Sequence, residues 1–119
     1  RSRDATIHAS TPIAALSRME PCAIMSGIEL PLTAIRMQVA SAINCVVHTM
    51  RLPDGSRKTV EIAEILPLEH GEYRTRTLMK WHTDSIAPDG TVTGRFMLGE
   101  KPSFADDAKI MGIELPEYP

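Results

Sequence analysis

The chain has 119 residues, enough for one domain of ordinary size, and its 43% hydrophobic and 24% charged residues predict a packed core rather than disorder. Its formal net charge of -2 excludes the global positive field that drives non-specific nucleic-acid binding, so we expect no nucleic-acid partner. Two cysteines are too few for a disulfide framework, and no apolar run approaches the roughly 18 residues that a membrane span needs.

The first segment predicts a helix that begins at Pro12. A short β-compatible stretch over residues 4–8 is followed by Ser10 and Thr11, and a Ser or Thr cap ahead of a proline at the first helical position is a typical helix start. Because a proline inside a helix removes a backbone donor and clashes with the preceding turn, we expect a kink or a break at Pro21. Gly27 is the expected C-terminal stop. The apolar positions at helical spacing are Ile13, Leu16 and Met19.

A second helix is expected from Pro31, because apolar residues recur every three or four positions after it. The pattern then changes to β-branched and apolar runs separated by turn residues, which predicts an antiparallel series of strands. Proline sets φ in these turns, and glycine tolerates a positive φ. The apolar helix positions are Leu32, Ile35, Val39 and Ala42 or Ile43; the strands are expected at 45–52, 57–66, 73–81 and 91–98, with turns at 53–56, 69–72 and 87–90.

A short helix is expected after the last strand. Ser103 is its expected cap, with Asp106 three residues later and Gly112 as the stop. Two helices, an antiparallel meander and a terminal helix make an α+β fold. We expect residues 1–66 and 67–119 to be two segments of one domain.

Common catalytic and metal-binding patterns are either absent or explained by other roles. The stretch "DGSRKT" at 54–59 lacks the spacing of a phosphate-binding loop and reads as a solvated turn. Cys45 and His48 would point to opposite faces of a strand, and two ligands do not make a zinc site. Ser10 lies close to His8 in the sequence but serves better as a helix cap than as a nucleophile. We therefore expect no metal site and no independent hydrolase triad.

Three basic residues, Arg74, Arg76 and Lys80, alternate along one predicted strand. Each is an even number of residues from the next, so they share one face. This face is either an ordinary solvated surface or a contact surface for an acidic partner.

The segment "ATIHASTPIAALSRME", residues 5–20, resembles the histidine box of the secretion and pilus-assembly traffic ATPases, in particular the Flp/Tad (CpaF-type) pilus ATPases. Residues 26–65 resemble the next block of that family, from "SGIELP" through "AIRMQVASAI" and "VVH" to "DGSRKTVEIAEI". The likeness covers roughly residues 5–66, about half of the chain. The matching residues of the box are Thr6, His8, Ala9, Ser10, Pro12, Ala15, Leu16, Arg18 and Glu20.

This resemblance implies the C-terminal part of a RecA-like motor domain, within a hexamer that uses ATP and Mg²⁺ to drive pilus assembly or protein export. It also implies a cytoplasmic location, peripheral at the inner membrane, with other copies of the protein and inner-membrane platform proteins as partners. Carried over to this sequence, the catalytic histidine near the γ-phosphate is His8, with Thr6 beside it. Arg18 is the next nucleotide-coupling candidate, while Arg36 and Gln38 match family positions without an assigned role.

The chain also departs from the family pattern. The glycine-rich approach to the box is replaced by "RSRD" at 1–4, Pro21 stands where relatives have a helix-compatible residue, and Walker A and Walker B are absent. Without a phosphate cradle and a Mg²⁺-holding carboxylate, we expect neither ATP turnover nor a bound cofactor from this chain alone. Since the sequence begins with Arg1, we expect a C-terminal piece of a longer protein. The alternative is a stand-alone protein-binding module that docks on platform or motor subunits through its basic strand face.

Overall fold

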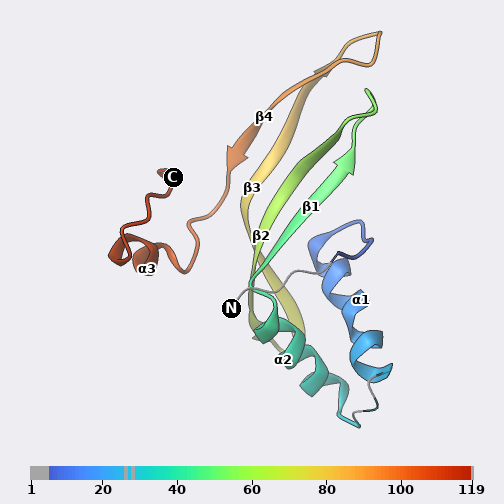
Figure 1. Ribbon diagram of the computed structural model, residues 1–119, viewed down its shortest axis with the longest axis vertical. Coiled ribbons are helices and arrows are strands. Elements are labelled where there is room, and N and C mark those ends of the chain that lie inside the picture. Colours follow the sequence, from blue (N-terminus) through green and yellow to red (C-terminus); the bar gives the residue numbers. More distant parts are fainter. Residues whose placement is uncertain (1–5, 26, 28, 119) are drawn as a thin grey trace. The chain divides into compact units, whose positions relative to one another are not determined.

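The computed structural model describes residues 6–25, 27 and 29–118. These residues form helices α1, α2 and α3 and a sheet with strand order β1-β2-β3-β4 (Figure 1). The chain divides into two compact units. Unit 1 contains the residues up to Asn44 together with Ile65–Thr75, and unit 2 contains Cys45–Glu64 together with the residues from Arg76 onward. Residue 66, the boundary expected from the sequence, lies inside strand β2.

Helix α1, Pro12–Met25, begins where the sequence predicts. Its cap is Thr11 rather than Ser10, because Thr11 Oγ1 accepts a hydrogen bond from the Ala14 N–H at 3.1 Å. The β-compatible stretch forms no strand over residues 6–8, which have no regular structure, while residues 4 and 5 lie outside the described residues.

Of the two outcomes expected at Pro21, a kink or a break, the break is wrong, because the helix continues to Met25. Pro21 is exposed, as is Ser17 one turn earlier, so water can solvate the carbonyl that the proline leaves without a donor. The helix ends as predicted at Gly27, which has a φ of 82° and donates its N–H to the Ile24 carbonyl at 3.2 Å.

Helix α2, Leu32–Ala42, follows Pro31 as predicted and lies beside α1 (Figure 1). Leu16 of α1 is 0% exposed and is the largest fully buried side chain of the described chain. Burying a leucine of this kind contributes about 1.5–3 kcal/mol, so this helix pair has a true apolar core. The buried hydrophobic residues of unit 1 are Ala15, Leu16, Ile35, Val39, Ile65 and Tyr73.

The strands follow the chain as a meander, and the β1–β2 and β3–β4 pairs are antiparallel. Two of the three connections use the same turn, Pro-Asp-Gly followed by Ser or Thr, as predicted. In the first turn, Gly55 has a φ of 85° and Asp54 Oδ1 accepts a hydrogen bond from the Ser56 N–H at 2.9 Å. In the second turn, Gly90 has a φ of 92° and Asp89 Oδ1 accepts a hydrogen bond from the Thr91 N–H at 3.0 Å. The strand bounds are Cys45–Arg51 for β1, Arg57–Glu69 for β2, Glu72–Ile86 for β3 and Val92–Leu98 for β4.

An aromatic pair packs on the sheet of unit 2. Trp81 of β3 faces Phe96 of β4 edge-on, with ring centroids 5.2 Å apart, and Lys58 Nζ lies 3.9 Å from the Trp81 ring centroid. Gly94 makes room for this arrangement, because a Cβ there would lie 2.5 Å from Trp81 Cζ2 and 2.3 Å from the His82 carbonyl oxygen.

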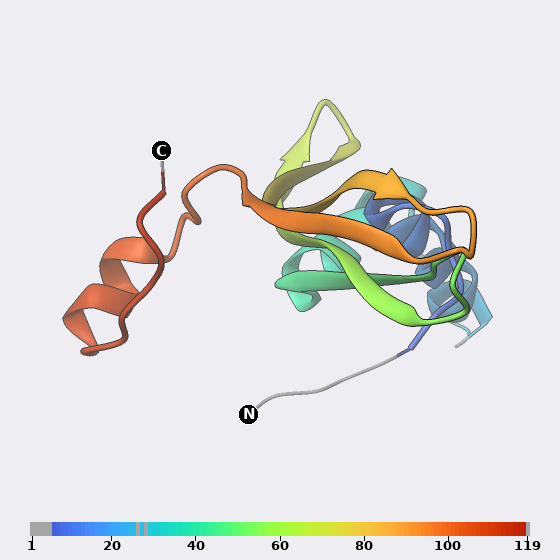
Figure 2. The same ribbon diagram turned by 90° about the horizontal axis from the view of Figure 1, so that it is seen from above.

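Helix α3, Ala105–Ile110, lies beyond β4 in unit 2 (Figure 2). The predicted cap is wrong, because no side chain caps α3 and Ser103 is bonded elsewhere. Its N–H donates to Glu64 Oε1 at 2.9 Å and its hydroxyl to Glu64 Oε2, which satisfies a carboxylate that is only 5% exposed. The predicted stop is confirmed, since Gly112 has a φ of 78° and the next N–H bonds back to the Ala108 carbonyl at 2.8 Å. Across the described residues, no helix combines the length and the apolar character that crossing a membrane requires.

Candidate functional site

The three residues of the histidine box that were assigned nucleotide-related roles, Thr6, His8 and Arg18, lie in unit 1 and are exposed. Thr6 and His8 belong to the irregular segment ahead of α1, and Arg18 lies on α1 itself. Among the described residues, His8 and Arg18 make no side-chain hydrogen bond or ion pair with each other or with a third group. The structure therefore leaves both side chains accessible, and their nucleotide-coupling roles stay predictions.

Helix α1 presents one continuous stripe to the interior of unit 1. Pro12, Ala15 and Leu16 are buried, and the stripe continues through half-buried positions one and two turns later. Glu20 lies on this stripe, one turn after Leu16. Arg18 lies about 200° around the helix axis from Leu16 and faces solvent.

Glu20 is the centre of a polar cluster that joins three elements of unit 1. Its Oε1 accepts a hydrogen bond from the Tyr73 hydroxyl at 2.7 Å and one from Arg36 Nε at 3.0 Å. Arg36 also donates through one terminal nitrogen to the Gly71 carbonyl at 3.1 Å, and its guanidinium lies 5.9 Å from the Tyr73 ring centroid. These four residues, here the Glu20 cluster, join α1, α2 and the end of the β2–β3 hairpin.

The electrostatics of the Glu20 cluster favour a neutral tyrosine beside the Glu20 carboxyl group. Burial raises the pKa of Tyr73 above its usual value of 10.0, and the hydrogen bond to Glu20 and the charge of Glu20 raise this pKa further. The Arg36 guanidinium acts in the opposite direction but is the smallest of these influences. Tyr73 therefore acts as a hydrogen-bond donor to Glu20 throughout the physiological pH range.

Tyr73 is a residue that the sequence did not single out. Glu20 and Arg36 both stood in the segments that carry the resemblance, and a carboxylate on the inward stripe of a helix signals a buried partner. The tyrosine is 53 residues away in the sequence, and its side chain reaches Glu20 only because the β2–β3 hairpin returns to α1.

The three basic strand residues differ in their surroundings. Arg74 of unit 1 pairs with Glu69, with Nε 2.9 Å from Oε2. In unit 2, Arg76 Nε lies 3.3 Å from a Glu100 carboxylate oxygen, while Lys80 is exposed. Because two of the three charges already face acidic groups of this chain, Lys80 is the most available to an acidic partner. Their role in partner binding stays a prediction.

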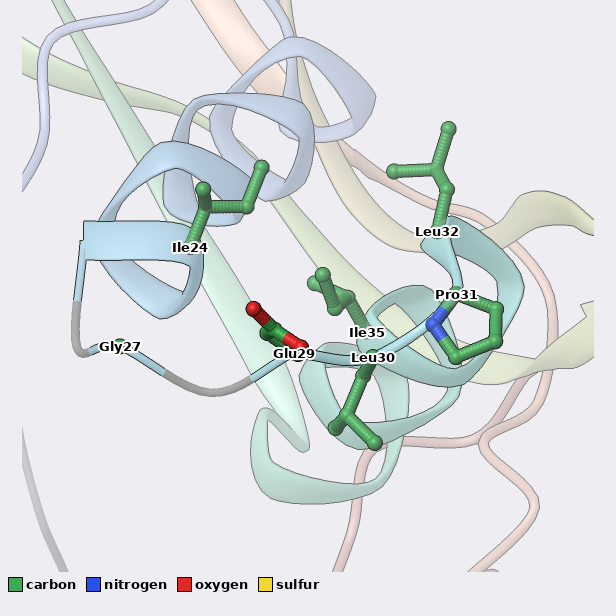
Figure 3. A pocket seen from close by; sticks show the side chains of 7 residues that line it. All are labelled: Ile24, Gly27, Glu29, Leu30, Pro31, Leu32 and Ile35. Atoms are coloured by element: carbon green, nitrogen blue, oxygen red, sulfur yellow. The ribbon is translucent and has the colours of Figure 1, made fainter.

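An open pocket of about 620 Å³ lies in unit 1 between the end of α1 and the start of α2 (Figure 3). It is apolar apart from one carboxylate, and none of the predicted site residues lines it. No group of three or more His, Cys, Asp or Glu side chains comes together in the part of the chain that the structure describes. The pocket is lined by Ile24, Gly27, Glu29, Leu30, Pro31, Leu32 and Ile35.

No family model matches the chain. The chain is similar to two proteins of Mycobacterium tuberculosis, from the strains CDC 1551 / Oshkosh and ATCC 25618 / H37Rv, each provisionally named a conjugal transfer protein. The identity to each is 32% over 79 residues, which cover 66% of this chain but 21% of the relative. The similarity thus spans about a fifth of the length of these relatives.

Proposed function

We propose that this chain is the C-terminal part of a hexameric ATPase that couples ATP hydrolysis to pilus assembly or protein export. The proposal is carried by the similarity to conjugal transfer proteins over two thirds of the chain. It is supported by the exposed position of His8 ahead of a capped helix. Its partners would be other copies of the protein and inner-membrane platform proteins, at the cytoplasmic face of that membrane.

The residues that the structure describes do not by themselves fit an ATP–Mg²⁺ site. A phosphate-binding helix start needs free backbone N–H groups, but α1 begins with Pro12, which has none, and Thr11 Oγ1 already accepts the Ala14 N–H. The described residues also offer no cluster of carboxylates for a cation. In this proposal the phosphate cradle and the metal ligands belong to preceding parts of a longer polypeptide, and His8 adds a hydrogen-bonding imidazole to that site. Thr6 and Arg18 support the coupling of this site to neighbouring subunits.

The test is ATP turnover by the longest natural polypeptide that contains this chain, with His8→Ala compared with the parent. We expect the variant to lose at least about a hundredfold in turnover, the lower end of what a positioned proton-transfer group contributes. His70→Asn is the matched control: it removes another exposed histidine, and asparagine tolerates the φ of 52° at that position. Parental turnover in His8→Ala would refute the role of His8.

A second candidate is a stand-alone module that binds platform or motor subunits. The lack of a self-sufficient nucleotide site among the described residues favours it. The discriminating observation is the DNA upstream of the codon for Arg1. An in-frame Gly-x-x-x-x-Gly-Lys-Ser/Thr supports the motor, whereas a start codon directly before Arg1 supports the module.

A further inference from the structure

Glu20 occupies a position of α1 where the surrounding stripe is otherwise apolar or small. Its side chain is 13% exposed, and the residues before it on the same stripe, Leu16 and Ala15, are buried. A charged group at such a position is costly unless it is paired, and an apolar residue would pack there without that cost. The carboxylate is thus not the residue that stability alone would select.

The contacts of Glu20 are directional hydrogen bonds, whereas the other residues of the α1 stripe make apolar contacts without a preferred direction. The hydrophobic contribution of apolar contacts such as those of Leu16 is non-directional. The bonds from Arg36 Nε at 3.0 Å and from the Tyr73 hydroxyl at 2.7 Å require the carboxylate at one place. Since these donors come from α2 and from the β2–β3 hairpin, the Glu20 cluster fixes both the rotation and the axial position of α1.

The position of α1 governs the start of the histidine box. Pro12 is eight residues before Glu20, which is about 12 Å along the helix. The hydrogen bond from the Ala14 N–H fixes Thr11 at the start of α1, and His8 lies four residues ahead of the helix in a segment without regular structure. A rotation of α1 therefore moves Thr11, which is the point from which the segment that carries His8 leaves the helix.

We propose that Glu20, held by Arg36 and Tyr73, is a positioning residue for His8, which keeps α1 in the single arrangement that presents the imidazole to the nucleotide. This inference rests on the proposed function, because the position of His8 matters for turnover only if the imidazole acts on a bound nucleotide. Arg36, which had no assigned role, is the residue of α2 that holds Glu20 in place.

The test replaces the cluster by apolar residues of similar size in the longest natural polypeptide: Glu20→Leu, Arg36→Met and Tyr73→Phe together. We expect the urea midpoint to be retained, because the side chains still fill the space. We expect kcat to fall about tenfold with the KM for ATP within about twofold of the parent, the pattern of a lost alignment rather than lost binding. The matched control, Lys101→Met with Asp106→Leu, removes an exposed ion pair of unit 2 and should change neither value.

A second readout does not depend on turnover. In the 119-residue chain labelled with ¹⁵N, the amide resonances of residues 6–11 should shift or broaden in the apolar triple variant and stay in place in the control. Should the triple variant fail to fold, Tyr73→Phe alone, which removes one oxygen, is expected to give a smaller shift of the same resonances. Unchanged resonances, or parental kcat in a folded triple variant, would overturn the positioning role. Absence of ATP turnover in the parental polypeptide would instead overturn the proposed function.

Discussion

Removal of the Tyr73 hydroxyl tests the energetics of the Glu20 cluster. In Tyr73→Phe the ring stays in a site that is 8% exposed, so the apolar burial is retained. The variant loses one hydrogen bond, 2.7 Å long, to a charged acceptor. Glu20 keeps its second donor, Arg36, so the carboxylate is not left unpaired.

The magnitude of the effect follows from these contacts. A hydrogen bond to a charged group contributes about 1.5–3 kcal/mol to stability. Because the Glu20 side chain is 13% exposed, water can partly replace the lost donor, which places the expected cost at about 1.5–2 kcal/mol. This corresponds to a roughly 10- to 30-fold increase in the unfolding equilibrium constant.

The assay is urea unfolding followed by far-ultraviolet circular dichroism, which reports on α1 and α2 of unit 1. A double-mutant cycle with Glu20→Gln should give a coupling of about 1 kcal/mol or more, since both substitutions act on the same bond. A cost below about 0.5 kcal/mol with no coupling would refute the reasoning, because it would mean that the hydroxyl is equally well solvated in the unfolded chain.

The contribution of Tyr73 to the free energy of unfolding should depend on pH, and the same variant tests this. Burial and the bond to Glu20 raise the pKa of Tyr73 above 10.0 in the folded chain, so the unfolded chain releases this proton first as the pH rises. The contribution of Tyr73 to stability is therefore complete below about pH 10 and falls by about 1.4 kcal/mol per pH unit above it. The stability difference between the parent and Tyr73→Phe should narrow from pH 10 to 11; a constant difference would contradict the raised pKa.

Two further predictions concern unit 2. Gly94→Ala should destabilise it by about 1–3 kcal/mol, because the new Cβ would lie 2.3 Å from the His82 carbonyl oxygen and 2.5 Å from the Trp81 ring; urea unfolding followed by the fluorescence of Trp81 measures this, and an unchanged midpoint would contradict the close approach. Burial, followed by the charge of Glu64, raises the pKa of the Cys45 thiol, so Glu64→Gln should speed its alkylation at pH 8 about two- to fivefold. Mass spectrometry with Cys22 as the internal reference measures the rate, and an equal or slower rate would exclude an influence of Glu64.

The local elements were the predictable part of the fold. Both Pro-Asp-Gly turns were found because their residues determine the backbone, and Pro12 marked the start of α1 because its ring suits the first helical position. Strand lengths were predicted less well, since β2 continues through Pro67 to Glu69. The β1–β2 pairing ends at Glu64, three residues before Pro67. The missing backbone N–H of Pro67 therefore removes no hydrogen bond to β1.

The parts that depend on tertiary contacts could not be predicted. Ser103 has the sequence of a helix cap, but a buried carboxylate 39 residues away binds its hydroxyl. In the sequence Glu20 is one residue of a family pattern. Its structural role depends on the bond from Tyr73, which lies at the start of β3, 53 residues later in the sequence. In both cases a buried charge required a partner, and no local pattern could say which residue would meet it.

The most direct test of the central claim is ATP hydrolysis by the longest natural polypeptide that contains this chain, with its His8→Ala variant and the 119-residue chain assayed beside it. The account predicts turnover by the long polypeptide, at least about a hundredfold loss in the variant and none by the chain alone. Hydrolysis by the chain alone, or equal turnover with and without His8, would contradict it.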